Sequence, residues 1–365
     1  MKVLCERKAL AEAVSVAGRA VPGRTALPIQ SHFLITAEDG SLKLAGADYE
    51  LQVEKQIGAQ VIEEGQCTVV ARVFQDIVGS LPDSDIELES QPDGKVFLKC
   101  RSSQYELLGL PAEEFPPLPH ISSEVGLSVT GATLKTLVRH TTFAVSDDAS
   151  RPQLTGINVL GSESSLKFAA TDGSRLVVRR VELEAPLRGE INCIVPARAL
   201  NEVARVLADD QVMEVSVTPN QVLFRLPTVS IVSRLIEGQF PNFERVIPKE
   251  YTKKVTAPAP ELHAASRRCM ILAEENQRLI LQLQGDQLHL KAESGKYGRG
   301  HEQVEVVREG EDIEIAFNAR FLNDFLAVVS SEGVDIEMTA PLSPGVFRPT
   351  ETDGFTYVLM PMHLM

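Results

Sequence analysis

The stretch Ala71–Val78 reads ARVFQDIV, and two later stretches repeat its pattern. The second copy is ARALNEVA at Ala197–Ala204, and the third is ARFLNDFL at Ala319–Leu326. The copies lie 126 and 122 residues apart, which is much longer than the roughly 20–50 residues of a solenoid repeat and matches a small domain. We therefore predict one domain used three times in tandem, with boundaries at residues 1–124, 125–252 and 253–365.

Each copy has the pattern of an amphipathic helix between two strands. At 3.6 residues per turn, apolar side chains such as Phe74 and Ile77 fall on one face and charged or amide side chains on the other. This pattern predicts helices over residues 71–81, 197–208 and 318–330. An apolar run precedes each helix, and an alternating run such as Ile86–Leu88 follows it, which indicates strands.

A second helix opens each repeat. Leu10, Leu134 and Leu262 recur at spacings of 124 and 128, and they predict helices over residues 6–24, 130–146 and 261–275. Turn-forming residues separate alternating runs elsewhere and indicate hairpins. Each repeat thus has two helices and about eight strands, an α+β architecture. Proline-rich stretches at 114–120 and 248–260 are interpreted as linkers.

The composition limits the possible environment and partners. The 365 residues are 44% hydrophobic, but no stretch approaches the roughly 20 apolar residues of a membrane helix. The N-terminus lacks a signal-peptide core. The five cysteines are scattered, which indicates reduced thiols and a cytoplasmic protein.

Charge is distributed unevenly along the chain. The net charge of −14 argues against a simple nucleic-acid-binding protein. The six predicted helices are together mildly basic, however, and the strands and loops are strongly acidic. Such a molecule would meet a polyanion only with its helices.

Motifs of catalysis and metal binding are missing from the sequence. Gly295–Gly300 is glycine-rich but lacks the strand-to-helix context of a phosphate-binding loop. The seven histidines do not have metal-ligand spacing, and no nucleophile elbow occurs. A binding or scaffold role without a cofactor is therefore favoured over an enzyme.

Four segments carry a resemblance to a known family. They are GRTALPI at Gly23–Ile29, ATDGSRL at Ala170–Leu176, FPNFERV at Phe240–Val246 and YVLMPM at Tyr357–Met362. Together with the triple repeat, they resemble the bacterial sliding clamp, the beta subunit of DNA polymerase III, over the whole chain. The resemblance implies the DNA clamp fold, in which two copies join head to tail and six repeats close into a ring with helices lining the hole. The implied function is non-catalytic: the ring encircles duplex DNA, slides along it and tethers the replicative polymerase.

The resemblance also implies which residues act. Basic side chains of the inner face would meet phosphates without reading sequence, and we expect this of Arg24, Lys135, Arg139, Arg198, Arg205, Arg268 and Arg320. The dimer contact would include Tyr105, Ile271 and Leu272.

A binding site for short partner peptides is implied between the second and third repeats. Its wall would consist of Leu154, Thr171, Gly173, Ser174, Arg175, Leu176, Pro241, Arg245, Val246, Pro344, Val358, Leu359, Met360, Pro361 and Met362. Methionines adapt to varied side chains. Two buried Leu or Phe anchors of about 1.5–3 kcal/mol each, less ordering costs, predict micromolar affinity.

The implied partners are duplex DNA, a second copy of the chain, the DNA polymerase III alpha subunit, the clamp loader, and other polymerases and repair proteins with a short clamp-binding motif. No membrane partner is implied, and the protein would associate with the nucleoid. Asp147, Asp148 and Gly79 stand where the family often has polar or basic residues, which implies weaker or differently placed DNA contacts. The chain also ends in His363–Met365 where a basic residue and leucine are usual.

Two alternatives stay open. One is an enzyme with a site at Asp172, Ser174 and Arg175, and the other is a peptide-binding hub that never meets DNA. The cations have a simpler interpretation as solvated surface charges, since Arg72, Arg198 and Arg320 each have an acid four residues further on.

Overall fold

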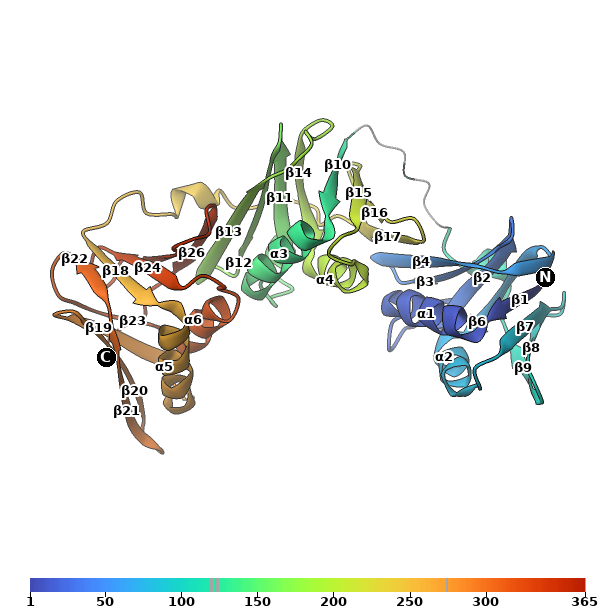
Figure 1. Cartoon of the computed structure of the whole chain (residues 1–365), viewed down its shortest axis with the longest axis horizontal. Helices are drawn as coiled ribbons and strands as arrows, with labels where there is room; N and C mark the ends of the chain where they lie inside the picture. Colours follow the sequence, from blue (N-terminus) through green and yellow to red (C-terminus); the bar gives the residue numbers. More distant parts are fainter. Residues whose placement is uncertain (118–120, 122–124, 274, 365) are drawn as a thin grey trace. The chain divides into compact units, whose positions relative to one another are not determined.

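The computed structural model describes residues 1–117, 121, 125–273 and 275–364 (Figure 1). They form two compact units, one of residues 1–131 and 198–235 and the other of residues 132–197 and 236–365. All strand pairs in both units are antiparallel. Mixed helices and antiparallel sheets confirm the predicted α+β class.

The first unit contains two sheets. The five-stranded sheet has the order β5 (Gln60–Glu63), β1 (Lys2–Glu6), β7 (Asp85–Ser90), β8 (Lys95–Cys100) and β9 (Ser103–Leu108). The eight-stranded sheet has the order β10 (Gly126–Thr130), β15 (Val212–Val217), β16 (Gln221–Arg225), β17 (Val229–Arg234), β4 (Leu51–Gly58), β3 (Ser41–Ala47), β2 (His32–Glu38) and β6 (Gly65–Val70). The helices of this part are α1 (Arg7–Ala17), α2 (Ala71–Ser80) and α4 (Ala197–Val206), with 3-10 turns η1 (Gly18–Ala20), η2 (Pro28–Ser31) and η3 (Ala112–Glu114).

The second unit is also built of two sheets. The nine-stranded sheet has the order β14 (Ile191–Pro196), β11 (Gly156–Ser162), β12 (Ser165–Thr171), β13 (Arg175–Glu182), β26 (Phe355–Leu359), β25 (Gly345–Pro349), β24 (Gly333–Met338), β18 (Lys253–Pro258) and β22 (Val307–Glu309). The four-stranded sheet has the order β21 (Gly298–Glu305), β20 (Gln287–Ser294), β19 (Arg278–Gln284) and β23 (Ile313–Asn318). The helices are α3 (Gly131–Thr141), α5 (Ala259–Leu272) and α6 (Ala319–Leu326), with 3-10 turns η4 (Thr142–Ala144), η5 (Pro152–Leu154) and η6 (Phe243–Arg245).

The helices bury the apolar faces that their periodicity predicts. In the first unit, Leu10 of α1 and Phe74 of α2 are fully buried in one cluster with Ile35 and Ile86 from the sheets. In the second unit, Leu262 of α5 and Leu322 of α6 are fully buried. Asn318 caps α6, because its side-chain oxygen accepts hydrogen bonds from the backbone N–H groups of Arg320 and Phe321.

Several predicted element ends are wrong. The helix predicted to reach Arg24 ends at Ala17 and continues as a 3-10 turn to Ala20. Pro22 follows, and a proline disfavours helical geometry in the residue before it. Arg24 therefore lies in an exposed loop.

The stretch interpreted as a linker before Pro260 instead contains β18, which pairs with β24. The helix after it begins at Ala259, because Pro260 fits its first turn. Helices α3, α4 and α6 are also shorter than predicted and end at Thr141, Val206 and Leu326. Residues 118–120 of the first predicted linker, residue 274 of the predicted helix 261–275, and Met365 lie outside the described residues.

The cysteines are free thiols that lie mostly in the interior of the protein. Cys5, Cys67, Cys100 and Cys269 are buried free thiols, and Cys193 is half-buried. No described helix is long and apolar enough to cross a membrane.

The buried imidazole of His140 makes stability depend on pH. It stacks on Phe355 with ring centroids 4.4 Å apart. Burial, followed by the charges of Arg139 and Arg179, lowers the pKa of His140 to about 4. An unfolded histidine has a pKa of about 6.5, so the unfolded chain binds a proton first as the pH falls.

We therefore expect the His140 contribution to stability to be fully present above pH about 6.5 and to be lost as the pH falls towards about 4. The loss should approach about 3 kcal/mol. Urea unfolding at pH 7 and pH 4.5 measures it, and His140→Gln should have a smaller difference between the two pH values than the wild type. An equal pH dependence in both proteins would contradict this expectation.

Candidate functional site

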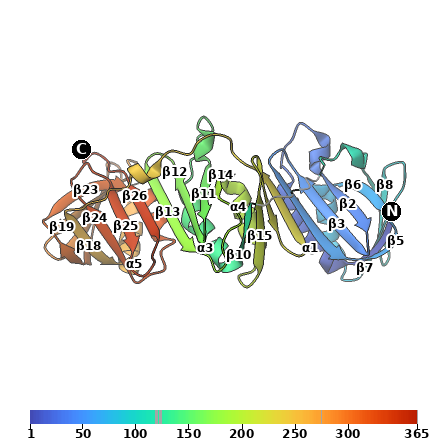
Figure 2. The same ribbon diagram turned by 90° about the horizontal axis from the view of Figure 1, so that it is seen from above.

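Strands β13 and β26 are far apart in the sequence and lie side by side in the nine-stranded sheet (Figure 2). Arg175 is opposite Leu359, and Leu176 is opposite Val358. The Met360 backbone N–H extends the pairing by donating to the Ser174 carbonyl at 2.9 Å. We call this β13–β26 pair, with the turn that precedes β13, the second seam.

Segments from elsewhere in the chain are fixed onto the second seam. Phe243 of η6 packs in one apolar cluster with Leu176, Val178, Val346 and Val358. This contact places the predicted residues Pro241, Arg245 and Val246 next to the strands. Beyond β26, Met362 forms a bridge with Ala316 of β23.

The turn before β13 is rigidly hydrogen-bonded. The Asp172 carboxylate accepts from the backbone N–H groups of Ser174 at 2.8 Å and Arg175 at 3.1 Å. The Thr171 hydroxyl donates to the Arg175 carbonyl at 2.6 Å and accepts from the Gly173 N–H at 3.1 Å. Gly173 has φ +97°, a left-handed conformation that side chains other than glycine rarely adopt. The exposed backbone of Gly173 therefore has a fixed conformation in which a ligand could contact it.

A loop outside the predicted site supports this turn. A Cβ added at Gly173 would lie 3.3 Å from Arg151 Nη1. The Asp148 carboxylate accepts a hydrogen bond from Arg151 Nε at 2.8 Å, and its hydrogen bonds to Ser150 and Arg151 lower the pKa of Asp148 to about 2. One of the two acids that depart from the family pattern thus orients an arginine near the second seam.

Arg175 has a different role from its neighbours. Its guanidinium is buried and pairs with Asp172 at 2.9 Å and with Asp324 of α6 at 2.7 Å. It also lies over the Phe321 ring, 4.1 Å from the centroid. Burial alone would lower the pKa of Arg175, but the hydrogen bond to Asp324 and the neighbouring acids raise it. Arg175 therefore fastens β13 to α6 on the helix side of the sheet.

Exposure separates the predicted peptide-site residues into three groups. The buried ones are Leu154, Arg175, Leu176, Val358 and Leu359. The half-buried ones are Thr171, Pro344, Pro361 and Met362. The exposed ones are Gly173, Ser174, Pro241, Arg245, Val246 and Met360. Among them, Pro241, Val246 and Met360 offer apolar surface to a ligand.

The predicted DNA-facing cations differ in their exposure and in whether they form ion pairs with acids. Arg24, after η1, and Arg320, on α6, are exposed and make no ion pair within the part of the chain that the structure describes. Lys135 and Arg139 lie on α3, and Arg139 is exposed. Arg198 and Arg205 on α4 pair with Asp48 and Glu202. Those pairs reduce the positive charge that α4 presents.

Arg268 lies on a face of α5 where it pairs with an acid, whereas the prediction expected it to face DNA. Its guanidinium forms two hydrogen bonds with Glu302 of β21, at 2.8 and 2.6 Å. Its neighbour Arg267 instead lines a groove of about 690 Å³ between α5 and α6, together with His263 and Arg320. The prediction missed Arg267, although its spacing of four residues from His263 and from Ile271 indicates a shared helix face.

The predicted dimer residues belong to the edge strand β9 and to helix α5. Tyr105 is on β9, the last strand of the five-stranded sheet, and is 37% exposed. Ile271 on α5 is 70% exposed. Leu272 packs against the edge strand β21, because a Cβ added at Gly300 would stand 2.8 Å from Leu272 Cδ1. Tyr105 and Leu272 are thus placed at edges that another chain could cover, while Ile271 is exposed on α5 and lines the groove between α5 and α6.

Potential metal ligands do not gather into a cluster in the described ranges. Residues 1–117, 121, 125–273 and 275–364 contain no cluster of three or more potential metal ligands. At the second seam, both oxygens of Asp172 are engaged by backbone N–H groups and Arg175. These contacts give Asp172 and Arg175 structural roles.

Tandem α+β repeats joined through shared sheets, with arginines on helices and exposed apolar residues beside the second seam, define a DNA-clamp architecture. Models of the DNA polymerase III beta subunit match its N-terminal domain at residues 1–119, its central domain at 128–242 and its C-terminal domain at 244–363. The chain belongs to the family of bacterial beta sliding clamps. It is a non-catalytic processivity factor of a DNA polymerase, and the predicted class of function is confirmed.

Individual relatives agree along their whole lengths. The beta sliding clamp of Synechococcus elongatus is 34% identical, and that of Synechocystis sp. is 32% identical, each with 100% of both chains covered. The crystal structure of the DNA polymerase sliding clamp from Bacillus subtilis has a TM-score of 0.97 at 28% identity. That of the DNA polymerase III subunit beta from Pseudomonas aeruginosa has a TM-score of 0.95 at 29% identity. Both comparisons cover 100% of each chain.

Proposed function

We propose that two copies of the chain close head to tail into a ring that encircles duplex DNA and slides along it. The ring holds the polymerase through a peptide site on the second seam. The observation that carries this proposal is the placement of Arg24 and Arg320, which make no ion pair among the described residues, on or beside helices in a chain of net charge −14. Contacts to phosphate alone hold DNA without reading its sequence, which suits sliding.

Two different strand edges support the head-to-tail contact. Strand β9 ends one sheet and β21 ends another, and both are largely exposed on the two faces of the strand. An unpaired strand edge is a template for pairing with another chain. Two unlike patches that meet produce a heterologous contact, which closes into a ring when the rotation permits.

The peptide site is proposed for the second seam. Met360 is hydrogen-bonded to Ser174 in the rigid turn at Gly173, and the exposed apolar residues Pro241 and Val246 flank Phe243, which packs on the same strands. The occupants would be short motifs of the DNA polymerase III alpha subunit, the clamp loader, and other polymerases and repair proteins.

We also propose a cytoplasmic, nucleoid-associated protein with the domains 1–124, 125–252 and 253–365. The matched family segments at 1–119, 128–242 and 244–363 support three domains and the first boundary, and they divide the second domain from the third about ten residues before residue 253.

Charge reversal tests the proposed DNA contact. We expect the variant Arg24→Glu, Arg139→Glu and Arg320→Glu to reduce processive synthesis on primed circular single-stranded DNA by at least about tenfold, because several phosphate contacts are replaced by repulsion. Arg198 is left unchanged because its reversal would set a second carboxylate beside Asp48.

The control is Arg188→Glu, which reverses an exposed charge in the segment between β13 and β14. Synthesis is measured with the clamp loader and polymerase present. Unchanged stimulation by the triple variant, with peptide binding retained, would favour a peptide-binding hub that does not meet DNA.

A further inference from the structure

The first unit contains a second copy of the seam. Strand β4 pairs with β17 so that Gln52 is opposite Val232, just as Leu176 is opposite Val358 in β13 and β26. The Asp48 carboxylate accepts from the N–H groups of Glu50 at 2.8 Å and Leu51 at 2.7 Å, as Asp172 does 124 residues later. We call this β4–β17 pair the first seam.

The backbone match extends to the end of the strand. The Arg234 N–H donates to the Glu50 carbonyl at 2.9 Å, and the Met360 N–H donates to the Ser174 carbonyl at 2.9 Å. Arg234 therefore occupies the position of Met360, the most accessible apolar residue of β26 and its extension. The repeat has produced the same geometry twice.

The side chains at the two seams differ in chemistry. Gln52 and Glu54 of the first seam stand where the second seam has Leu176 and Val178. In the second seam these residues are covered by Phe243. In the first seam, the described residues leave the corresponding surface hollow.

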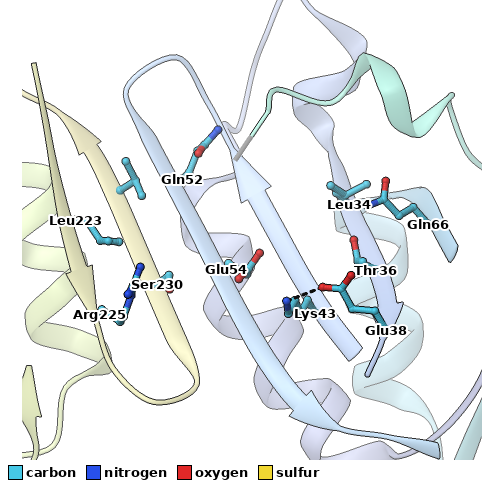
Figure 3. A pocket seen from close by; sticks show the side chains of 11 residues that line it. Leu34, Thr36, Glu38, Lys43, Gln52, Glu54, Gln66, Leu223, Arg225 and Ser230 are labelled. Atoms are coloured by element: carbon cyan, nitrogen blue, oxygen red, sulfur yellow. Dashed lines mark hydrogen bonds and ion pairs between the residues drawn. The ribbon is translucent and has the colours of Figure 1, made fainter. Parts of the chain in front are cut away.

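The hollow has two adjoining parts. One part, of about 320 Å³, is lined by Tyr49, Glu50 and Arg234 among others. The other, of about 270 Å³, is lined by Glu54, Arg225 and Ser230 among others (Figure 3). Gln52 and Val232 line both parts, so the two form one groove along β4 and β17.

The groove has one acidic and one basic side. Glu50 and Glu54 belong to β4 and the turn before it, and neither forms an ion pair among the described residues. Arg225 and Arg234 belong to β16 and β17, and they likewise lack an ion-pair partner in the described ranges. Figure 3 shows Glu54 in the middle of the hollow, with Arg225 across from it.

The other polar side chains that line the groove include Lys43, which has an ion-pair partner, and Gln52, whose side-chain oxygen is without a hydrogen bond in the described structure. The Lys43 ammonium lies 2.6 Å from Glu38, so it is not held by Glu54. Burial raises the pKa of Glu54, although the charge of Lys43 opposes that effect. The buried Gln52 Oε1 accepts no hydrogen bond within the described structure. A ligand that carries a cation would stabilise Glu54 in its charged form.

We propose that the groove of the first seam is a second docking site, which takes an extended peptide segment with alternating basic and acidic side chains. Successive side chains of an extended peptide point to opposite sides, so bases would meet Glu50 and Glu54 while acids meet Arg225 and Arg234. The lining of β4 and its turn runs from Asp48 to Glu54, which at about 3.3 Å per residue accommodates about six residues.

The test uses the full-length protein and a fluorescein-labelled, end-capped hexapeptide, Lys-Glu-Lys-Glu-Lys-Glu. The matched probe is Lys-Lys-Lys-Glu-Glu-Glu, which has the same composition and net charge. Fluorescence polarisation should show saturable binding of the alternating peptide and at least about fivefold weaker binding of the block peptide. Glu54→Gln and Arg225→Gln should each weaken the alternating peptide about five- to tenfold. Glu184→Gln, an exposed carboxylate after β13, should leave it unchanged.

Three results would overturn the proposal: no saturable binding, equal binding of the two hexapeptides, or equal affinity in the wild type and in both groove variants. Displacement of the peptide by a single-stranded oligonucleotide would also overturn it, since the basic side would then be a nucleic-acid surface. The proposal does not rest on the peptide site of the second seam. A Gln-Leu-x-Leu-Phe pentapeptide should bind Glu54→Gln as it binds the wild type, so failure at one seam is distinguishable from failure at the other.

Discussion

Replacement of Met360 by glutamate is expected to weaken binding of a Gln-Leu-x-Leu-Phe pentapeptide by at least about thirtyfold. Met360 is 40% exposed, and its backbone is fixed to Ser174 at the second seam. An apolar anchor buried against it contributes about 1.5–3 kcal/mol, and a carboxylate in the same place would be desolvated without a partner. Since 1.4 kcal/mol is a factor of ten, the two effects together exceed one order of magnitude.

Fluorescence polarisation measures this loss, with Val307→Glu as the matched control. Val307 is 73% exposed on β22, so the same chemical change there should alter neither folding nor peptide affinity. Truncation after Tyr357 would be a poor test, because Val358 and Leu359 are buried and pair with β13 and β25. Wild-type affinity in a folded Met360→Glu protein would remove the second seam as the peptide site.

Replacement of Phe325 by alanine is expected to lower the free energy of unfolding by about 3–5 kcal/mol, the usual range for a large aromatic residue in a packed core. Phe325 is fully buried on α6. Its ring stacks on Tyr357 with centroids 4.7 Å apart and meets Phe355 at 5.5 Å and Phe347 at 5.9 Å. It therefore joins α6 to β25 and to β26, and β26 is one of the two strands of the second seam.

Urea unfolding followed by circular dichroism measures the change in stability. The exposed substitution Val307→Ala serves as the control and should change stability by less than about 0.5 kcal/mol. A loss below about 1 kcal/mol for Phe325→Ala would mean that the aromatic cluster can close around the cavity. Peptide affinity should fall as well, because β26 loses its support from α6.

Local patterns were sufficient for the elements and the repeat. The period of 3.6 residues placed Phe74 and Leu322 on buried helix faces, and both are fully buried. Element ends were less predictable. Arg24 fell outside its helix because Pro22 interrupts a pattern that otherwise continues, and residues 253–258 form β18 because a strand 80 residues later pairs with them.

The residues of the second seam were likewise only partly predictable from the sequence. The segments 171–176, 241–246 and 358–362 could be identified from their letters, and the structure brings them together. The residue types in these segments did not indicate which side chains remain accessible to a ligand. Arg175 and Leu359 are buried, whereas Met360 is exposed, because strand pairing assigns alternate residues to opposite faces of the sheet.

The sequence by itself determined the triple repeat, the helical and strand periods and the membership of the clamp family, since these depend on residue order over short stretches. Only the tertiary structure decided which charges are used within the fold and which remain free. Arg268 forms an ion pair with Glu302 while Arg267 lines a groove. Glu54 lies opposite Arg225 and has no ion-pair partner among the described residues. Those outcomes depend on contacts between residues far apart in the chain, and a local pattern contains no information about such distances.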